Sequence, residues 1–337
     1  MATGPIAVRR IWSRAAHSAF TDLARFRGRW FCVFRESDSH ARGRDGGIRV
    51  ISSPDGRIWK SETRLSKRGV DLRDPHLSIT PQGELMLTMG GSVWDKGRYL
   101  RMQPQVAFSR TGRAWTVPEA ILHEGEWLWR VAWHKGHAYG IAKLDHHKRE
   151  TERTSRARAI LYRSRDGRNY TRVCEIGLEG VDETAVGFDG QGRMVAVARR
   201  GSPDCRAAIG ISRAPFTRWS WSLLPHYVGG PAVLLARGKP MILGGRHFPA
   251  RRPGGQPAGE PVTFLGTFDE KGCAIRWILP SGGDNSYPGL CLWKDELWVS
   301  YYSSHEGKSA IYLARIPLKR LLEAAPFPSR WECWNPS

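Results

Sequence analysis

The sequence has 337 residues, a formal net charge of +20 and 41% hydrophobic residues, which include 15 Trp. This content is enough for a packed core and excludes a disordered chain, and no apolar stretch reaches the roughly 20 residues that a membrane-spanning helix needs. The charge comes mostly from arginines spread along the chain without a block of basic residues. That spread disfavours nucleic acid as a partner and favours an anionic ligand such as an acidic sugar or glycoconjugate.

The N-terminal residues bear on the cellular compartment in which we expect the protein. Residues 1–10 contain no apolar segment of the kind found in signal peptides. We therefore expect a cytoplasmic protein, or a secreted or periplasmic one if an export segment was removed. No membrane partner is expected, and the oligomeric state is left open.

One pattern recurs six times along the chain: an apolar strand, a tight turn and a second apolar strand. Consecutive turns lie 46 to 57 residues apart, a period typical of the blades of a β-propeller. The sequence thus predicts one all-β domain over residues 1–337, a six-bladed β-propeller with blades from about residue 17 to residue 316 and a short C-terminal extension over 317–337. The turns centre on Arg27-Gly28, Gln82-Gly83, Lys135-Gly136, Gln191-Gly192, Arg237-Gly238 and Lys294-Asp295.

A second motif recurs with the same period. It reads Ser-Pro-Asp-Gly-Arg-Ile-Trp at 53–59 and returns at 109–115 and 164–170, with a degraded copy at 212–219. Asp or Ser side chains that bind backbone amides, a glycine and an aromatic anchor are typical of a structured turn. The only expected helix, over 318–325, follows the last blade.

The second motif resembles the Asp box of the sialidase superfamily, although it is one residue shorter, and the whole chain resembles a six-bladed sialidase-like propeller. Members of that family bind the carboxylate of a sugar with three arginines, whose planar forks suit a carboxylate. They use a tyrosine nucleophile activated by a glutamate, and an aspartate as the acid/base. The resemblance implies an exo-glycosidase of this type.

The resemblance assigns the central residues by their place in the blades. Tyr287, at the start of blade six, is the expected nucleophile, and Glu183, at the start of blade four, is its expected base. Arg199 and Arg246, at the ends of the second strands of blades four and five, are the expected ligands of the sugar carboxylate. If the strand register differs by one residue, Arg200 takes the place of Arg199 as the expected carboxylate ligand.

Blade one departs from the family pattern. The Phe-Arg-Ile-Pro of the family is replaced by Phe-Thr-Asp-Leu at residues 20–23, so the first arginine is absent. Arg35, at the end of the second strand, and Arg73, in blade two, are the candidates to replace it. The acid/base aspartate is expected in the loop after Arg35, with Asp38 as the first choice and Asp45 as the second.

Further substrate contacts are expected from Asp74, His40 and Arg130, with Trp129 as a face on which a sugar could stack. The six cysteines form no Cys-x-x-Cys pair, and neither a metal nor an organic cofactor is expected. We expect a retaining exo-glycosidase for a terminal acidic sugar, either sialic acid or a related nonulosonic or uronic acid. The first alternative is a non-catalytic glycan-binding propeller, and the second is a basic propeller scaffold.

Overall fold

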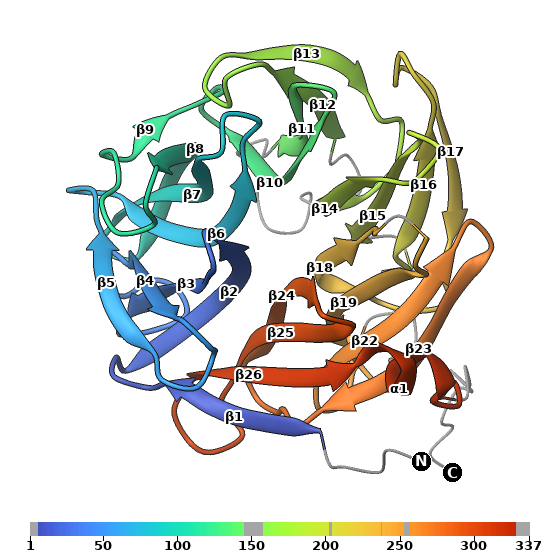
Figure 1. The fold of residues 1–337 in the computed structure, drawn as a ribbon. Coiled ribbons are helices and arrows are strands. Elements are labelled where there is room, and N and C mark those ends of the chain that lie inside the picture. Colours follow the sequence, from blue (N-terminus) through green and yellow to red (C-terminus); the bar gives the residue numbers. More distant parts are fainter. Residues whose placement is uncertain (1–5, 145–157, 202–203, 237, 253–256, 328–337) are drawn as a thin grey trace.

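Six four-stranded antiparallel sheets surround one axis in the computed structural model (Figure 1). The predicted six-bladed β-propeller is confirmed. The structure describes residues 6–144, 158–201, 204–236, 238–252 and 257–327.

Each blade is a meander in which the first strand lies closest to the axis (Figure 1). The first three blades are β2 (His17–Phe26), β3 (Arg29–Ser37), β4 (Gly47–Ser53) and β5 (Lys60–Leu65); β6 (Asp71–Ile79), β7 (Leu85–Asp95), β8 (Arg98–Ser109) and β9 (Glu119–Ala120); and β10 (Glu126–His134), β11 (His137–Leu144), β12 (Arg158–Ser164) and β13 (Tyr170–Glu175). The next two are β14 (Val181–Phe188), β15 (Met194–Arg200), β16 (Ala208–Ser212) and β17 (Trp219–Leu223); and β18 (Gly229–Leu234), β19 (Met241–His247), β22 (Val262–Asp269) and β23 (Gly272–Leu279). A two-stranded excursion, β20 (Ala250–Arg251) and β21 (Pro257–Ala258), leaves the fifth blade.

The sixth blade joins the two ends of the chain. Its strands β24 (Asn285–Trp293), β25 (Glu296–Ser303) and β26 (Ala310–Pro317) come from the C-terminal part, and its outermost strand is β1 (Ala7–Trp12). The sequence prediction began the blades at about residue 17 and did not foresee β1. Pairing of β1 with β26 closes the ring through main-chain hydrogen bonds and leaves the propeller without an open seam.

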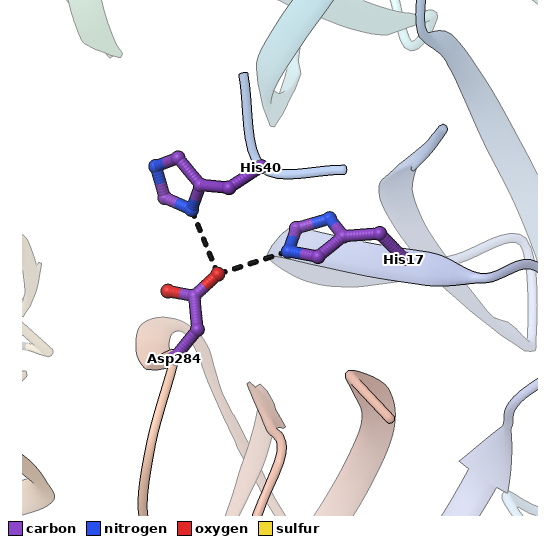
Figure 2. A group of neighbouring side chains, drawn as sticks. All are labelled: His17, His40 and Asp284. Carbon is purple, nitrogen blue, oxygen red and sulfur yellow. Dashed lines mark hydrogen bonds and ion pairs between the residues drawn. The ribbon is translucent and has the colours of Figure 1, made fainter. Parts of the chain in front are cut away.

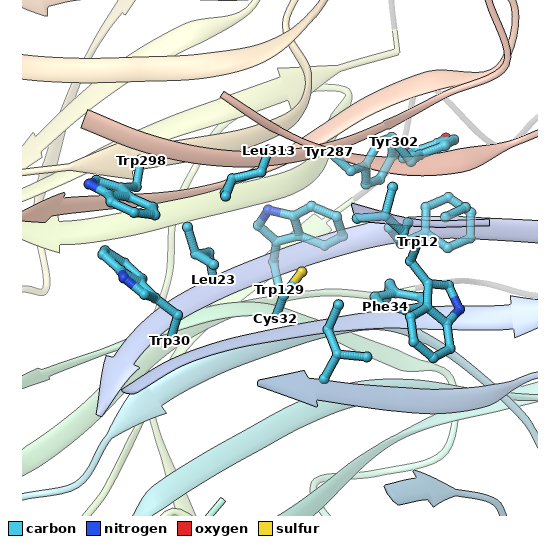
Figure 3. Close-up of a cluster of buried hydrophobic side chains, with 14 of the residues drawn as sticks. Trp12, Leu23, Trp30, Cys32, Phe34, Trp129, Tyr287, Trp298, Tyr302 and Leu313 are labelled. Atoms are coloured by element: carbon cyan, nitrogen blue, oxygen red, sulfur yellow. The ribbon is translucent and has the colours of Figure 1, made fainter. Parts of the chain in front are cut away.

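Aromatic packing supports the same closure between blades one and six. Trp30 and Trp298 stack with ring centroids 4.1 Å apart at 19° (Figure 3), and both are buried. Buried aromatic side chains of this size contribute strongly to a core. The closed ring therefore rests on a hydrophobic contact as well as on strand pairing.

The second sequence motif fastens neighbouring blades. In its first copy, the amide of Gly56 donates to Ser53 Oγ over 2.8 Å, and Trp59 Nε1 donates to the Gly56 carbonyl over 3.1 Å. A Cβ on Gly56 would lie 2.3 Å from the ring of Trp298 in the adjacent blade. Glycine is required there because the turn presses directly on its neighbour, and Gly112 is placed in the same way against Phe31.

One helix, α1 (Leu318–Glu323), follows β26 and buries Leu318 and Leu321. It is shorter than the predicted range of 318–325. Within the described ranges, no helix is long and apolar enough to cross a membrane.

Candidate active site

A β-bulge occurs at the same place in the innermost strand of every blade, where two residues have no partner on the neighbouring strand. Bulges redirect side chains and are frequent at functional sites. The bulge pairs are, from blade one to blade six, Phe20-Thr21, Asp74-Pro75, Trp129-Arg130, Asp182-Glu183, Gly230-Pro231 and Tyr287-Pro288. Five of the sequence-predicted site residues are among them: Asp74, Trp129, Arg130, Glu183 and Tyr287.

The backbone at four of these bulges adopts a left-handed conformation. The φ angles are 59° at Phe20, 45° at Asp74, 57° at Gly230 and 50° at Tyr287. Outside glycine this conformation is costly and is retained where the surrounding structure enforces it. The bulges are therefore rigidly held positions around the axis.

Tyr287 and Glu183, the expected nucleophile and base, meet near the axis. The hydroxyl of Tyr287 donates to Glu183 Oε1 over 2.7 Å, and both side chains are buried. The other carboxylate oxygen, Oε2, accepts the amide of Gly230 over 2.8 Å. Burial, followed by the charge of Glu183, raises the pKa of Tyr287 well above its ordinary value, so the tyrosine is neutral and donates its proton.

Arg199 lies against this pair. Its Nη1 is 3.0 Å from Glu183 Oε1 and 3.4 Å from the Tyr287 hydroxyl. Burial alone would lower the pKa of Arg199, but Glu183 and its other anionic neighbours raise it well above its usual value. A permanent positive charge thus faces the tyrosine oxygen. The alternative in register, Arg200, instead binds Asp204 Oδ1 over 2.8 Å and the carbonyl of Glu179.

Asp182 and Lys143 extend this charged group on its other side. Asp182 Oδ1 accepts from Lys143 Nζ over 2.5 Å, and Oδ2 lies 3.6 Å from Arg199 Nε. Burial tends to raise the pKa of Asp182, but Lys143 and Arg199 hold it at about 2. Lys143 is not among the sequence-predicted site residues, although it lies seven residues after its turn, the position that Arg35 and Arg199 occupy in their blades.

Arg246 lies close to Tyr287 but already makes several hydrogen bonds to other residues. Its guanidinium lies over the Tyr287 ring at 5.4 Å from the centroid. Nε donates to the carbonyl of Asn285 over 2.9 Å, and Nη2 donates to the hydroxyl of Tyr302 over 2.8 Å and lies 3.2 Å from Asp284 Oδ1. Tyr302 and Asp284 were not foreseen.

Asp284 also binds two histidines. Its Oδ2 lies 2.9 Å from His17 Nε2 and 2.7 Å from His40 Nδ1 (Figure 2). Burial would raise the pKa of Asp284, but the hydrogen bonds from the two imidazoles lower it. His40, a predicted substrate contact, is thus placed beside Arg246 through a residue that no motif had marked.

The two candidates to replace the missing arginine have different surroundings. Arg35 is completely buried, with Nε bound to Asp71 Oδ1 over 2.8 Å and Nη1 donating to the carbonyl of Ser39 over 2.7 Å. Arg73 is 3.5 Å from Asp71 Oδ2, and its guanidinium lies 5.2 Å from the centroid of the Phe20 ring. Arg73 keeps 12% of its side chain exposed, whereas Arg35 keeps none.

Asp74 is a second buried carboxyl group beside Glu183. Its Oδ1 has no hydrogen-bond partner among the described residues. Burial raises the pKa of Asp74 to about 6, with Arg73 opposing and Glu183 adding to the shift. The charge of Asp74 also contributes to the raised pKa of Tyr287 and of Tyr302.

Asp38, the first choice for the acid/base, lies in a different setting. It is exposed, and its Oδ1 accepts from the hydroxyls of Ser37 and Ser39 and from the amide of Arg44 over 3.0 to 3.3 Å. All these contacts lie within its own loop, so the structure gives Asp38 the role of a loop cap. Asp45, the second choice, is also exposed.

Arg130 and Trp129 lie on the axis and bind main-chain carbonyls. Arg130 contacts Asp22 Oδ1 over 3.0 Å and donates to the carbonyl of Pro288 over 2.6 Å. Trp129 Nε1 donates to the carbonyl of Pro231 over 3.1 Å, and its ring meets the edge of Tyr287 at a centroid distance of 5.7 Å. Both side chains therefore support the bulges from the axis.

No protein-family model matches the chain, and no curated protein matches it significantly. The fold, in contrast, is shared with many solved structures.

A protein of unknown function from Dyadobacter fermentans superposes with a TM-score of 0.77 at 17% identity, over 92% of this chain and 99% of that one. A Trypanosoma rangeli sialidase in complex with sialic acid gives a TM-score of 0.71 at 12% identity, over 95% of this chain. The chain spans 60% of the length of that sialidase. An α-L-arabinofuranosidase from Fusarium graminearum in complex with an iminosugar inhibitor gives 0.69 at 13% identity, over 95% of this chain and all of that one.

Proposed function

We propose that this protein is a retaining exo-glycosidase in which Tyr287 is the nucleophile and Glu183 its base. The observation that carries the proposal is the 2.7 Å hydrogen bond from the Tyr287 hydroxyl to Glu183 Oε1, with Arg199 3.0 Å from the same oxygen. A buried tyrosine needs a base to become nucleophilic, and a nearby cation stabilises the phenolate that develops. The similar folds of a sialidase and an arabinofuranosidase support sugar chemistry as the class of reaction.

Asp74 is our choice for the acid/base in place of Asp38. It is buried, has an oxygen without a partner among the described residues, and has a pKa raised to about 6. A general acid must hold its proton at the working pH, and burial of a carboxyl group achieves this. Asp38, which caps an exposed loop, lacks these properties.

The proposed reaction has two steps. In the first, the oxygen of Tyr287 attacks the anomeric carbon, its proton passes to Glu183, and Asp74 gives its proton to the departing glycosidic oxygen as that bond breaks. In the second, water attacks the anomeric carbon and gives a proton to Asp74. The tyrosine oxygen leaves and recovers its proton from Glu183. The anomeric configuration is retained because it is inverted twice.

An acidic sugar is our first choice of substrate. Arg199 and Arg246 contact Tyr287 directly. Arg73 lies over the ring of Phe20, which packs against Tyr287, and Lys143 binds Asp182, a neighbour of Arg199. Guanidinium groups bind carboxylates with two parallel hydrogen bonds. The net charge of +20 also favours the approach of anionic ligands.

A neutral sugar is the second candidate, because each of these cations already has a carboxylate partner. Arg199 is paired with Glu183, Arg246 with Asp284, Arg73 with Asp71, and Lys143 with Asp182. A cation that is already neutralised contributes less to binding a further anion. The arabinofuranosidase among the similar structures also favours this candidate.

A panel of fluorogenic glycosides decides between these substrates. Sialosides and uronides represent the acidic sugars, and pentofuranosides and hexosides represent the neutral ones. Release from an acidic sugar alone supports the first candidate, and release from a neutral sugar alone supports the second. If no member is cleaved but acidic sugars raise the melting temperature, the protein is a glycan-binding propeller rather than an enzyme.

A further inference from the structure

Three donor side chains from separate parts of the chain converge beside Arg246. His17 begins β2, His40 follows β3, and Asp284 directly precedes β24. Their atoms His17 Nε2, His40 Nδ1 and Asp284 Oδ2 lie within 4.8 Å of one another. Figure 2 shows both imidazole nitrogens directed at the same carboxylate oxygen.

The other oxygen of the Asp284 carboxylate, Oδ1, has partners of its own. It accepts from the Tyr302 hydroxyl over 2.8 Å and lies 3.2 Å from Arg246 Nη2. The main-chain amide of Asp284 donates to Ser304 Oγ over 2.9 Å. These contacts leave Oδ2 to the two histidines. In metal sites, a ligating carboxylate is typically oriented by such contacts to its other oxygen.

The two imidazoles are also fixed by packing. The His17 ring is buried and meets the edge of the Tyr302 ring at a centroid distance of 6.4 Å. The His40 ring meets the Phe20 ring at 5.0 Å. Because 47% of the His40 side chain is exposed, an ion can reach the group from solvent.

We propose that His17, His40 and Asp284 bind a divalent transition-metal ion of the zinc type. Two imidazole nitrogens and one carboxylate oxygen suit such an ion, which they bind at about 2.0–2.2 Å. Ligand atoms around a tetrahedral ion at that distance are roughly 3.3 Å apart. The present separations of 2.7 and 2.9 Å between nitrogen and oxygen must therefore lengthen by about half an ångström when the ion binds.

Two features of the group set the cost of binding. Arg246 neutralises part of the charge of Asp284, which weakens the attraction for a cation. A neutral imidazole that binds the ion through Nε2 carries its proton on Nδ1, and His17 Nδ1 is buried without a hydrogen-bond partner among the described residues, which also weakens binding. Three protein ligands leave coordination positions for water or a sugar oxygen, as in metal sites that bind substrates. This site departs from the sequence-based expectation that no metal is involved.

The test uses tag-free protein that has been treated with a chelator and then titrated with Co²⁺ and with Zn²⁺. Co²⁺ reports its ligands by visible absorption, and Zn²⁺ binding is measured by calorimetry. We expect saturable binding of both ions by the wild-type protein, with loss of the Co²⁺ absorption in His40→Ala and in Asp284→Asn. His137→Ala, which changes a histidine on β11 in another blade, is the matched control and retains binding.

Absence of saturable binding in the wild-type protein, or unchanged binding in His40→Ala, would overturn the proposal. If Asp284→Asn fails to fold, His40→Ala decides the question, because its half-exposed ring is dispensable for the core. The readout is metal binding and not hydrolysis. The metal site can therefore fail while the glycosidase proposal holds, and the reverse is equally distinguishable.

Discussion

Tyr287 and Glu183 occupy corresponding β-bulges of two blades that are separated by a third, and the tyrosine hydroxyl donates to the glutamate over 2.7 Å. The bulge of the intervening blade supplies Gly230, whose amide holds the other oxygen of Glu183 over 2.8 Å. Three successive blades thus fix one hydrogen bond. The account of the candidate site depends on this arrangement.

Gly230 is expected to tolerate no side chain. A Cβ there would lie 2.7 Å from atoms of the Tyr287 ring, and its φ of 57° is unfavourable for other residues. Gly230→Ala should lower the free energy of unfolding by about 2–4 kcal/mol, from backbone strain and overpacking together. Denaturant unfolding measures the change.

Gly136→Ala is the control for that substitution. Gly136 has a φ of 77°, but a Cβ there meets nothing within 4 Å. This variant should lose only about 1–2 kcal/mol from backbone strain and keep any sugar binding. Equal behaviour of the two variants would argue against a crowded bulge beside Tyr287.

Asp74→Asn should stabilise the protein near neutral pH. The folded state raises the pKa of Asp74 from 3.8 to about 6, so folding disfavours the ionised form. The penalty is absent below pH 4, grows as the pH rises to 6 and then stays constant at about 3 kcal/mol. The amide removes it, so the melting temperature should rise at pH 7.5 and change little at pH 4. A loss of stability at pH 7.5 would contradict the burial of an unpaired carboxyl group.

Under the proposed mechanism, Asp74 should also set the pH dependence of hydrolysis. As a general acid, Asp74 must be protonated in the first step, so kcat/KM should fall as the pH rises above about 6. Asp74→Asn should remove this fall and lower the maximal rate by about 10²–10⁴-fold. Asp38→Asn is the comparison, and it should keep both the rate and the profile. The reverse result would return the role to Asp38.

We expect Arg35 to be a structural residue and Arg73 to face the ligand. Arg35 is fully buried and bound to Asp71, so Arg35→Met removes the closer of the two arginines that pair with this buried carboxylate and should cost about 3–5 kcal/mol. Arg73 is partly exposed above Phe20, so Arg73→Met should weaken sugar binding with a smaller loss of stability. Thermal melting and calorimetric titration with the substrate sugar test both. Loss of sugar binding only in Arg35→Met would contradict the assignment.

Arg130→Met should destabilise the whole propeller. Arg130 joins Asp22 to the carbonyls of Pro231 and Pro288 across the axis, and breaking a buried pair costs about 3–5 kcal/mol. Arg213→Met, at an exposed position, should be neutral. If Arg130→Met melts like the wild type but no longer binds sugar, the sequence-based assignment of Arg130 to substrate binding is the better one.

The fold could be predicted because it repeats. Each hairpin turn leaves a local signature, as at Arg27-Gly28, whose φ angles of 46° and 76° give a turn that suits two twisted strands. The strand β1 was missed because it pairs with β26, at the other end of the chain. A single unrepeated strand carries no periodic signal.

The candidate site was partly predictable for the same reason. Glu183, Tyr287, Asp74 and Arg130 lie at one position of the repeat, and the bulge residues recur with the period of the turns. The partners of the arginines could not be foreseen. Asp284 lies just outside β24, and only the folded chain shows that it binds Arg246 and two histidines.

The proposed exchange of roles between Asp38 and Asp74 has a physical cause. In the sequence, a loop rich in Asp, Ser and His indicates a reactive site. In the structure, the carboxylate of Asp38 accepts hydrogen bonds from the hydroxyls of Ser37 and Ser39 within the same loop. Burial decides whether a carboxyl group keeps its proton, and burial is a property of the tertiary structure.

The most direct test of the account is hydrolysis of the best substrate of the glycoside panel by the wild-type protein and by Tyr287→Phe, measured side by side. The substitution removes one oxygen and leaves the ring in place, so the melting temperature and the affinity for the sugar should change little. The account predicts that kcat falls at least about a thousand-fold. A variant that cleaves the substrate at a rate close to that of the wild type would contradict the assignment of Tyr287 as the nucleophile.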